Sequence, residues 1–218
     1  MKNKIGNKVN ISLVLIFFVA VVSCKKDEDV TLQFNQNLEY GTLTDIEGNV
    51  YKTIEIGTQT WMAENLRVTK QNDGSSSISF KWPLNDSIAF KNAYGAKYNW
   101  GSVNTGKLCP EGWHVPKDNE WTVLTNYLGG DSIAGGKLKE AGPKHWSSPN
   151  VGATNETGFT AMPSRDGDYP RMMGFMWSSS EFNSEYGWYR ALDHNSAAVY
   201  RNFDFNKSRY YSVRCIKD

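Results

Sequence analysis

The chain has 218 residues, of which 39% are hydrophobic and 22% are charged, so it is long enough for one well-formed core and short for two. Its formal net charge is +1, and removal of the first 23 residues leaves 21 basic against 23 acidic residues, a formal charge of −2. A nearly neutral domain of this kind argues against nucleic acid as a partner.

The first residues predict an export signal. Three lysines precede an apolar run over residues 13–22, which is shorter than the ~20 apolar residues of a membrane-spanning helix. The run ends at Val21-Val22-Ser23-Cys24, which resembles the lipobox of bacterial lipoproteins, where Cys24 is lipidated and becomes the mature N-terminus. The alternative is an ordinary signal peptide with a chance cysteine. We favour residues 1–23 as a lipoprotein signal peptide, because a small residue precedes Cys24 and a charged run follows it.

Residues 24–43 are expected to form the lipidated N-terminus and a flexible tether, because residues 25–29 are too polar to pack. This run also resembles the acidic signal that sends some lipoproteins to the outer face of the outer membrane, and a plain spacer is the equal alternative. The expected location is therefore the outer membrane, with exposure at the cell surface and attachment through the lipid anchor only.

The first clear strand is expected over residues 50–56, where Val50, Ile54 and Ile56 share one face at a period of two. Residues 60–62 are its expected hairpin partner. Further on, Trp121 and Leu124 mark one face of a helix expected over residues 117–128.

A second, shorter helix is expected over residues 133–140, where Gly135-Gly136 indicates close backbone packing. Turn residues dominate 143–174, apart from a short strand expected at 158–163. The chain then ends in an antiparallel meander, with strands expected at residues 186–192, 197–203 and 210–216. Strands, two central helices, loops and strands in this order predict one α+β domain over residues 44–218.

Two cysteines remain besides Cys24, and two thiols in an exported domain usually pair. A bridge between Cys109 and Cys215 would close a loop of about a hundred residues and contribute up to ~4–5 kcal/mol in the loop-entropy view. The alternative is two separately buried thiols. Cys109 also opens residues 109–116, where two prolines, a glycine and Trp113 are expected to fasten the next helix to the core.

A series of short motifs runs along the chain in a fixed order. They are Trp61-Met62-Ala63-Glu64-Asn65-Leu66, Cys109-Pro110-Glu111-Gly112-Trp113-His114-Val115-Pro116, and residues 45–48, 51–57, 94–95, 120–121, 134–138, 155–159, 177–181 and 212–215. Together they resemble the FISUMP, or major paralogous, domain over about residues 44–218. The resemblance implies an exported bacterial domain, often on a lipoprotein, with a fold similar to C-type lectins and formylglycine-generating enzymes. The expected fold is therefore a C-type-lectin-like α+β domain with two short central helices and a C-terminal antiparallel meander.

No catalytic residue is expected. The formylglycine-generating relatives use a pair of reactive cysteines, whereas the two cysteines here stand where the family has a structural pair. His114, His145 and His194 lack the spacing of a metal site, and residues 178–180 lack the histidine and the strand-turn-helix context of a hydrolase serine. We therefore expect a non-catalytic protein.

Calcium is a weaker expectation. Lectins of this fold hold calcium through loop carboxylates and amides, and residues 166–168 with Glu181, Asn183 and Glu185 supply such oxygens. Because no complete ligand spacing is present, a simple turn is favoured and no cofactor is expected.

Glycan binding is expected from the aromatic residues, which include eight tryptophans and eleven tyrosines. A flat ring stacks on a sugar face while nearby polar groups bind its hydroxyls. Attachment to polysaccharide has been suggested for the family, and we expect the loop surface 164–190 to bind polysaccharide or a surface glycan. Its candidate residues are Arg165, Asp166, Asp168, Tyr169, Trp177, Trp188, Tyr189 and Arg190.

Two alternatives stay open for this surface. Aromatic residues at strand positions usually pack in a core, as we expect for Trp61, Trp113 and Trp121. A protein-protein interaction or adhesion module of the same fold would also present variable loops to its ligand.

Overall fold

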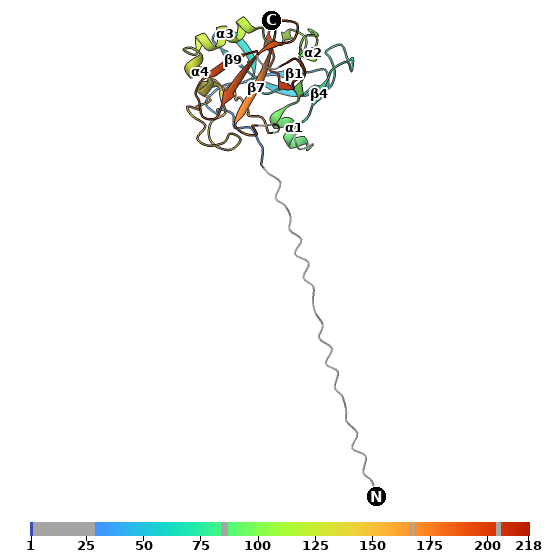
Figure 1. The fold of residues 1–218 in the computed structure, drawn as a ribbon, viewed down its shortest axis with the longest axis vertical. Helices are drawn as coiled ribbons and strands as arrows, with labels where there is room; N and C mark the ends of the chain where they lie inside the picture. Colours follow the sequence, from blue (N-terminus) through green and yellow to red (C-terminus); the bar gives the residue numbers. More distant parts are fainter. Residues whose placement is uncertain (2–28, 84–86, 166, 168, 204–205) are drawn as a thin grey trace.

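The computed structural model describes residue 1 and residues 29–83, 87–165, 167, 169–203 and 206–218. Within these ranges the chain forms a mostly-sheet α+β fold, in which two curled and largely antiparallel sheets are joined by short helices. The predicted α+β class is confirmed. Figure 1 shows the sheets at the centre, with α3 and α4 together on one flank and α1 at the end where the described chain begins.

The first sheet has the order β1-β2-β3-β11-β6, and each pair is antiparallel. Its strands are β1 (Gly41–Thr44), β2 (Val50–Ile56), β3 (Gln59–Met62), β6 (Trp113–His114) and β11 (Ile216–Lys217). The hairpin of β2 and β3 confirms the expected pairing. The expected faces of β2 are only partly right, because Val50 is 53% exposed while Tyr51 and Thr53 are buried. Both faces of β2 contain buried residues. The alternation of apolar and polar residues along this strand therefore does not separate a core face from a solvent face.

The second sheet has the order β4-β5-β10-β7-β8-β9. Its strands are β4 (Phe80–Lys81), β5 (Lys97–Tyr98), β7 (Met173–Glu181), β8 (Gly187–Asp193), β9 (Val199–Asn202) and β10 (Tyr211–Ser212). Only the β10 and β7 pair is parallel.

Three expectations for the end of the chain are corrected. The strand expected at 210–216 is two strands, since β10 belongs to the second sheet and β11 to the first. The strand expected at 158–163 is a single bridge between Ala161 and Lys139. In contrast, β7 was not among the expected strands: its first two residues lie in the range 143–174 that we expected to be turns, and it is the longest strand described.

The helices are α1 (Ile88–Tyr94), α2 (Trp100–Val103), α3 (Asp118–Tyr127) and α4 (Asp131–Leu138). The two central helices, α3 and α4, confirm the prediction. The close packing expected at the glycine pair of α4 is also confirmed, because a Cβ on Gly135 would lie 2.2 Å from the Ala198 carbonyl oxygen and one on Gly136 would lie 2.4 Å from that of Gly152.

A disulfide joins Cys109 to Cys215, as predicted, with their Cα atoms 5.9 Å apart. It ties the segment before β6 to the residue that precedes β11. Of the expected tryptophan anchors, Trp61 and Trp121 are fully buried, whereas Trp113 is only partly buried at the edge of the core. The disulfide rather than the indole of Trp113 is therefore the main fastening of this segment.

A fully buried guanidinium, that of Arg214, joins three of the family motifs. Its Nε donates to Oδ1 of Asn65 at 3.0 Å, and its terminal nitrogens donate to the carbonyls of Phe159 and Thr160. These acceptors are all neutral, and burial lowers the pKa of Arg214 to about 9.

The N-terminal strap, defined as residues 29–40, is packed on the domain. The side chain of Val30 is buried, the backbone N–H of Gln33 donates to Oε1 of Glu140 at 2.7 Å, and Nζ of Lys144 contacts Oδ2 of Asp29 at 3.0 Å. The expectation of a flexible tether over residues 24–43 is therefore wrong for residues 29–43, because apolar side chains and a buried carboxylate hold them.

The expected signal peptide and lipidated Cys24 lie outside the described residues, apart from residue 1. Among the described residues, none of the helices has the length and apolar character needed to cross a membrane.

Candidate ligand-binding groove

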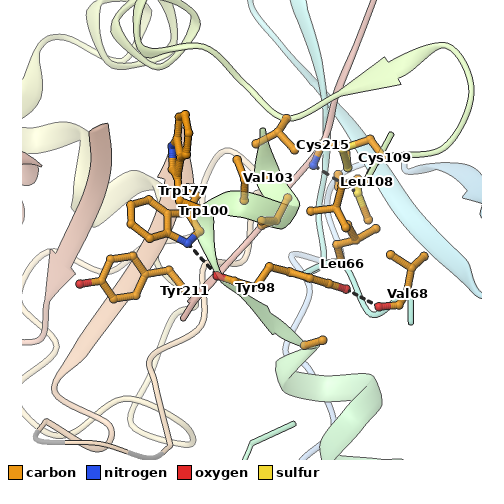
Figure 2. Close-up of a cluster of buried hydrophobic side chains, with 14 of the residues drawn as sticks. Leu66, Val68, Tyr98, Trp100, Val103, Leu108, Cys109, Trp177, Tyr211 and Cys215 are labelled. Atoms are coloured by element: carbon orange, nitrogen blue, oxygen red, sulfur yellow. Dashed lines mark hydrogen bonds between the residues drawn. A yellow bond between two sulfur atoms is a disulfide. The ribbon is translucent and has the colours of Figure 1, made fainter. Parts of the chain in front are cut away.

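Two of the expected ligand-binding aromatics belong to the core. Trp177 is fully buried and its Nε1 donates to the carbonyl of Tyr98 at 2.8 Å, while Tyr189 is 1% exposed. Figure 2 shows the indole of Trp177 beside Tyr211 and Trp100, with its N–H directed at that carbonyl. The core alternative therefore applies to both residues, because almost none of their surface is exposed.

Arg190 is also inside the protein, with 1% of its surface exposed. Its Nη1 donates to Oδ1 of Asp118 at 2.8 Å, and Arg201 binds the same carboxylate at 2.8 Å. Burial raises the pKa of Asp118, but the hydrogen bonds from Arg201 and Arg190 outweigh it and hold the pKa below its ordinary value. Arg190 thus fixes the first turn of α3 to β8 and is not a surface group.

Among the described residues that the sequence predicted to bind a ligand, Tyr169 lies on an open, hollowed surface. Its side chain is 52% exposed. Arg165 lies against α1, with its guanidinium carbon 5.5 Å from the ring centre of Phe90. Asp166 and Asp168 lie outside the described residues.

Two adjoining hollows of about 280 and 300 Å³ share Tyr169 and Phe175, and we call them together the groove. The first is lined by Lys81, Lys97, Ser164, Gly167, Tyr169, Phe175, Ser208, Arg209, Tyr210 and Tyr211. The second is lined by Tyr169, Met173, Phe175, Tyr189, Ala191, Asp193, Tyr200 and Asn202.

Strand register creates the floor of the groove. Tyr200 pairs with Ala191 across β9 and β8, and Ala191 pairs with Phe175 across β8 and β7. Residues directly opposite each other share a face of the sheet, so these side chains form one row. The ring of Phe175 stacks on that of Tyr211, with their centres 5.0 Å apart. The small side chain of Ala191 leaves a depression between the larger rings.

Polar side chains line the same two hollows. Lys81, Lys97 and Arg209 border the first hollow, and Asp193 and Asn202 border the second. Flat rings with hydrogen-bonding groups beside them suit a ligand that has an apolar face and polar edges.

Trp188 lies in a separate aromatic patch, formed by Phe182, Trp188 and Phe203. The rings of Phe182 and Phe203 stack with their centres 3.7 Å apart, and both contact Trp188 edge to face. The guanidinium carbon of Arg201 lies 3.5 Å from the ring centre of Trp188. Because neighbouring residues of a strand point to opposite faces, Trp188 faces away from the side of β8 that carries Tyr189 and the groove.

The loop expected to offer calcium ligands holds an ammonium group. Nζ of Lys207 contacts the carboxylate of Glu181 and the carbonyls of Asn183 and Ser184, the last two at 2.8 and 3.0 Å. The loop oxygens therefore surround a lysine, and Asp166 and Asp168 lie outside the described residues. Among the residues that are described, no group of three or more His, Cys, Asp or Glu is placed to hold a metal ion.

Each histidine is hydrogen-bonded inside the fold. His114 bonds Glu120 at 2.9 Å and Asp218 at 2.6 Å, and His145 bonds the buried carboxylate of Glu140 at 2.6 Å. Nδ1 of His194 lies 3.0 Å from the carbonyl oxygen of Ser148. These contacts agree with the structural role expected for the histidines.

Sequence reasoning missed most of the groove, including Phe175, Tyr200 and Tyr211. The sequence signal was weak because the residues come from three strands, and one of those strands, β7, was not expected at all. The adjacent pair Tyr210-Tyr211 in an otherwise polar segment was the clearest available hint.

Comparison with known proteins places the chain in a family. No curated protein and no solved structure matches it. The sequence profile described as the Fibrobacter succinogenes major domain matches residues 54–217, which is most of the chain. The protein is therefore a member of the Fibrobacter succinogenes major domain family.

Proposed function

We propose that this protein is a non-catalytic, lipid-anchored protein of the cell envelope that binds extracellular polysaccharide through the groove. The observation that carries the proposal is the row of aromatic rings at the groove, bordered by lysine, arginine, aspartate and asparagine side chains. A pyranose ring has an apolar face of C–H groups and a rim of hydroxyls, so it matches this arrangement.

The proposal revises the surface expected from the sequence. Tyr169 is kept from the loop surface 164–190, while Trp177, Tyr189 and Arg190 are removed as direct ligands because they are buried. The new members with exposed side chains include Tyr200, Lys81, Ser208 and Arg209.

The lectin-like fold and the surface location are parts of the same proposal. Two antiparallel-rich sheets, two central helices and a disulfide that fastens the last strand support a C-type-lectin-like domain. The lipobox-like residues 21–24 support the anchor. Protease treatment of intact cells tests surface exposure, and a protein that stays intact there while being cut in lysed cells would contradict it.

The central experiment measures retention of the purified protein on insoluble cellulose, xylan, pectin, chitin and alginate. We expect retention on at least one of them, with Tyr169→Ala and Tyr200→Ala each weakening it about tenfold, equivalent to ~1.4 kcal/mol. Both side chains are substantially exposed, at 52% and 40%, so their loss should leave the fold intact.

The matched control is Tyr127→Ala, which removes another exposed tyrosine, on α3 and outside the groove. It should bind like the unaltered protein. Failure of the unaltered protein to bind any of the polysaccharides, or full binding by both groove variants, would contradict the proposal.

A protein ligand is the second candidate, and the aromatic patch favours it. Phe182 and Phe203 expose 42% and 38% of their surfaces beside Trp188, and exposed aromatic clusters are common at protein interfaces. If Phe182→Ser abolishes capture of a protein from the cell surface while the groove variants do not, the adhesion function is favoured over polysaccharide binding.

A further inference from the structure

We infer that the α1 end of the domain, defined as α1 and residues 29–32, faces the phospholipid surface in which the protein is anchored. The inference rests on the lipid anchor of the proposed function. It adds the orientation of the domain and a side chain that contacts the headgroups.

The first support is a fixed attachment point on the domain. Asp29 is held in place, because its Oδ1 accepts a hydrogen bond from the Thr31 N–H at 3.0 Å and its Oδ2 contacts Nζ of Lys144 at 3.0 Å. The next side chain, that of Val30, is 2% exposed and packs with Phe90 of α1. The chain therefore joins the domain at one defined place, beside α1.

The second support is the length of chain between the anchor and this place. Cys24 lies five residues before Asp29, and five residues extend over at most about 18 Å when fully stretched. A compact domain of this size is about 40 Å across, from the usual scaling of the radius of gyration with chain length. If the opposite end of the domain faced the membrane, this short linker would have to cross the full width of the domain. The linker is too short to do so.

The third support is the surface around the attachment point. Asn92 of α1 lines a hollow of about 460 Å³ together with Asp29 and Val30. Ile88 lies one turn earlier on the same face of α1, and its side chain is 77% exposed, the highest value among the large apolar side chains described after Met1. An apolar side chain this close to a lipid anchor can bury in the boundary between headgroups and acyl chains.

The arrangement of the elements agrees with this orientation. Figure 1 shows α1 at the end where the described chain begins, whereas α3 and the C-terminus lie at the opposite end. Probes on α1 and on α3 therefore report on the two ends of the domain.

The test uses the full-length lipidated protein, purified from its membrane and reconstituted in phospholipid vesicles. Cys24 is blocked by its lipid and Cys109 is bonded to Cys215, so an introduced cysteine is the only free thiol. A fluorophore on Ile88→Cys should be quenched severalfold more strongly by headgroup-attached quenchers than one on Val123→Cys, the matched exposed position on α3.

A spacer supplies a second measurement. About twenty Gly and Ser residues inserted between residues 28 and 29 add an average reach of ~25 Å and leave the contacts of the strap unchanged. Quenching at Ile88→Cys should then fall toward that at Val123→Cys.

Two outcomes would contradict the inference in different ways. Equal quenching at the two positions without the spacer, or stronger quenching at Val123→Cys, would overturn the orientation and leave the lipid anchor standing. Mass spectrometry that finds an unmodified Cys24 would instead remove the proposed anchor, and the inference with it.

Discussion

At the scale of single residues, Arg214 explains why distant motifs occur together. A buried guanidinium is costly unless its N–H groups find acceptors. Here those acceptors are Oδ1 of Asn65 and the carbonyls of Phe159 and Thr160; Asn65 and Phe159 belong to two other motifs, and Thr160 directly follows the second of them. The sequence displays these motifs as separate segments, and only the fold shows that one side chain depends on all of them.

Asp118 allows a prediction at the same scale. Its carboxylate is the shared partner of the buried Arg190 and of Arg201. Asp118→Asn should lower the free energy of unfolding at neutral pH by about 3 kcal/mol, because it leaves a buried charge without its partner.

The effect of Asp118→Asn should depend on pH. The folded protein holds the pKa of this carboxyl below its ordinary value, so its stabilisation is present above the unfolded pKa, near 4, and is lost as pH falls through the lowered folded pKa. Urea unfolding should therefore show a difference between the two proteins that shrinks below about pH 4. Asp73→Asn, in an exposed pair with Lys107, is the control and should have little effect. A difference that stays constant with pH would count against this role.

At the scale of elements, the sequence predicted the strands and helices whose formation depends mainly on neighbouring residues. The hairpin of β2 and β3 carries its turn signal within a few residues, and α3 carries an acidic first turn and an apolar periodicity. β7 does not, because several consecutive residues from Met176 to Ser178 are buried and the alternation is lost. The assignment of β10 and β11 to different sheets also depends on contacts between residues that are far apart in the sequence. The backbone of Val213 and Cys215 accepts hydrogen bonds from Leu66 and Met62, which carries the chain from one sheet to the other.

The glycine pair of α4 yields a prediction whose sign depends on packing. Gly→Ala inside a helix usually stabilises by ~1 kcal/mol. In Gly136→Ala the new Cβ would lie 2.4 Å from the carbonyl oxygen of Gly152, and the Gly136 N–H already donates to the carbonyl of Ala197 at 2.8 Å. The backbone at Gly152 cannot move aside without a cost in free energy. We therefore expect Gly136→Ala to lower the free energy of unfolding in urea by about 2 kcal/mol.

The control for this variant is Ser132→Ala in the same helix, at an exposed position. It should leave the unfolding midpoint nearly unchanged or raise it slightly. A Gly136→Ala protein as stable as the unaltered one would show that the helix can shift away from the 152 loop, contrary to the tight packing described here.

At the scale of the whole molecule, the groove could be predicted only in part. Tyr169 was accessible to sequence reasoning because it lies in a charged, turn-rich loop. Tyr200, Phe175 and Tyr211 become neighbours only through the register of β7, β8 and β9 and the parallel placement of β10 beside β7. Long-range pairing of this kind has no local signature, so the candidate surface was assigned to a continuous stretch of sequence.

The N-terminal strap is the other feature that only the whole molecule reveals. Its buried Val30 packs with Phe90 and Ala93 of α1, and Phe34 and Tyr40 pack against the core beneath Nζ of Lys52, which lies 5.0 and 4.9 Å from their ring centres. The strap therefore works as part of the domain, although its composition resembles a spacer.

Removal of the strap should destabilise the domain. A chain that begins at residue 41 should unfold at lower guanidinium concentration than one that begins at residue 29, with a loss of about 2–4 kcal/mol, because buried apolar surface outweighs the entropy of ordering the strap. Gln36→Ala, at an exposed position of the strap, is the control and should leave the midpoint unchanged. Polysaccharide retention should survive in the shortened chain below its unfolding midpoint, since the strap does not line the groove. Equal midpoints for the two chains would show that the strap is a spacer that rests on the surface without stabilising the fold.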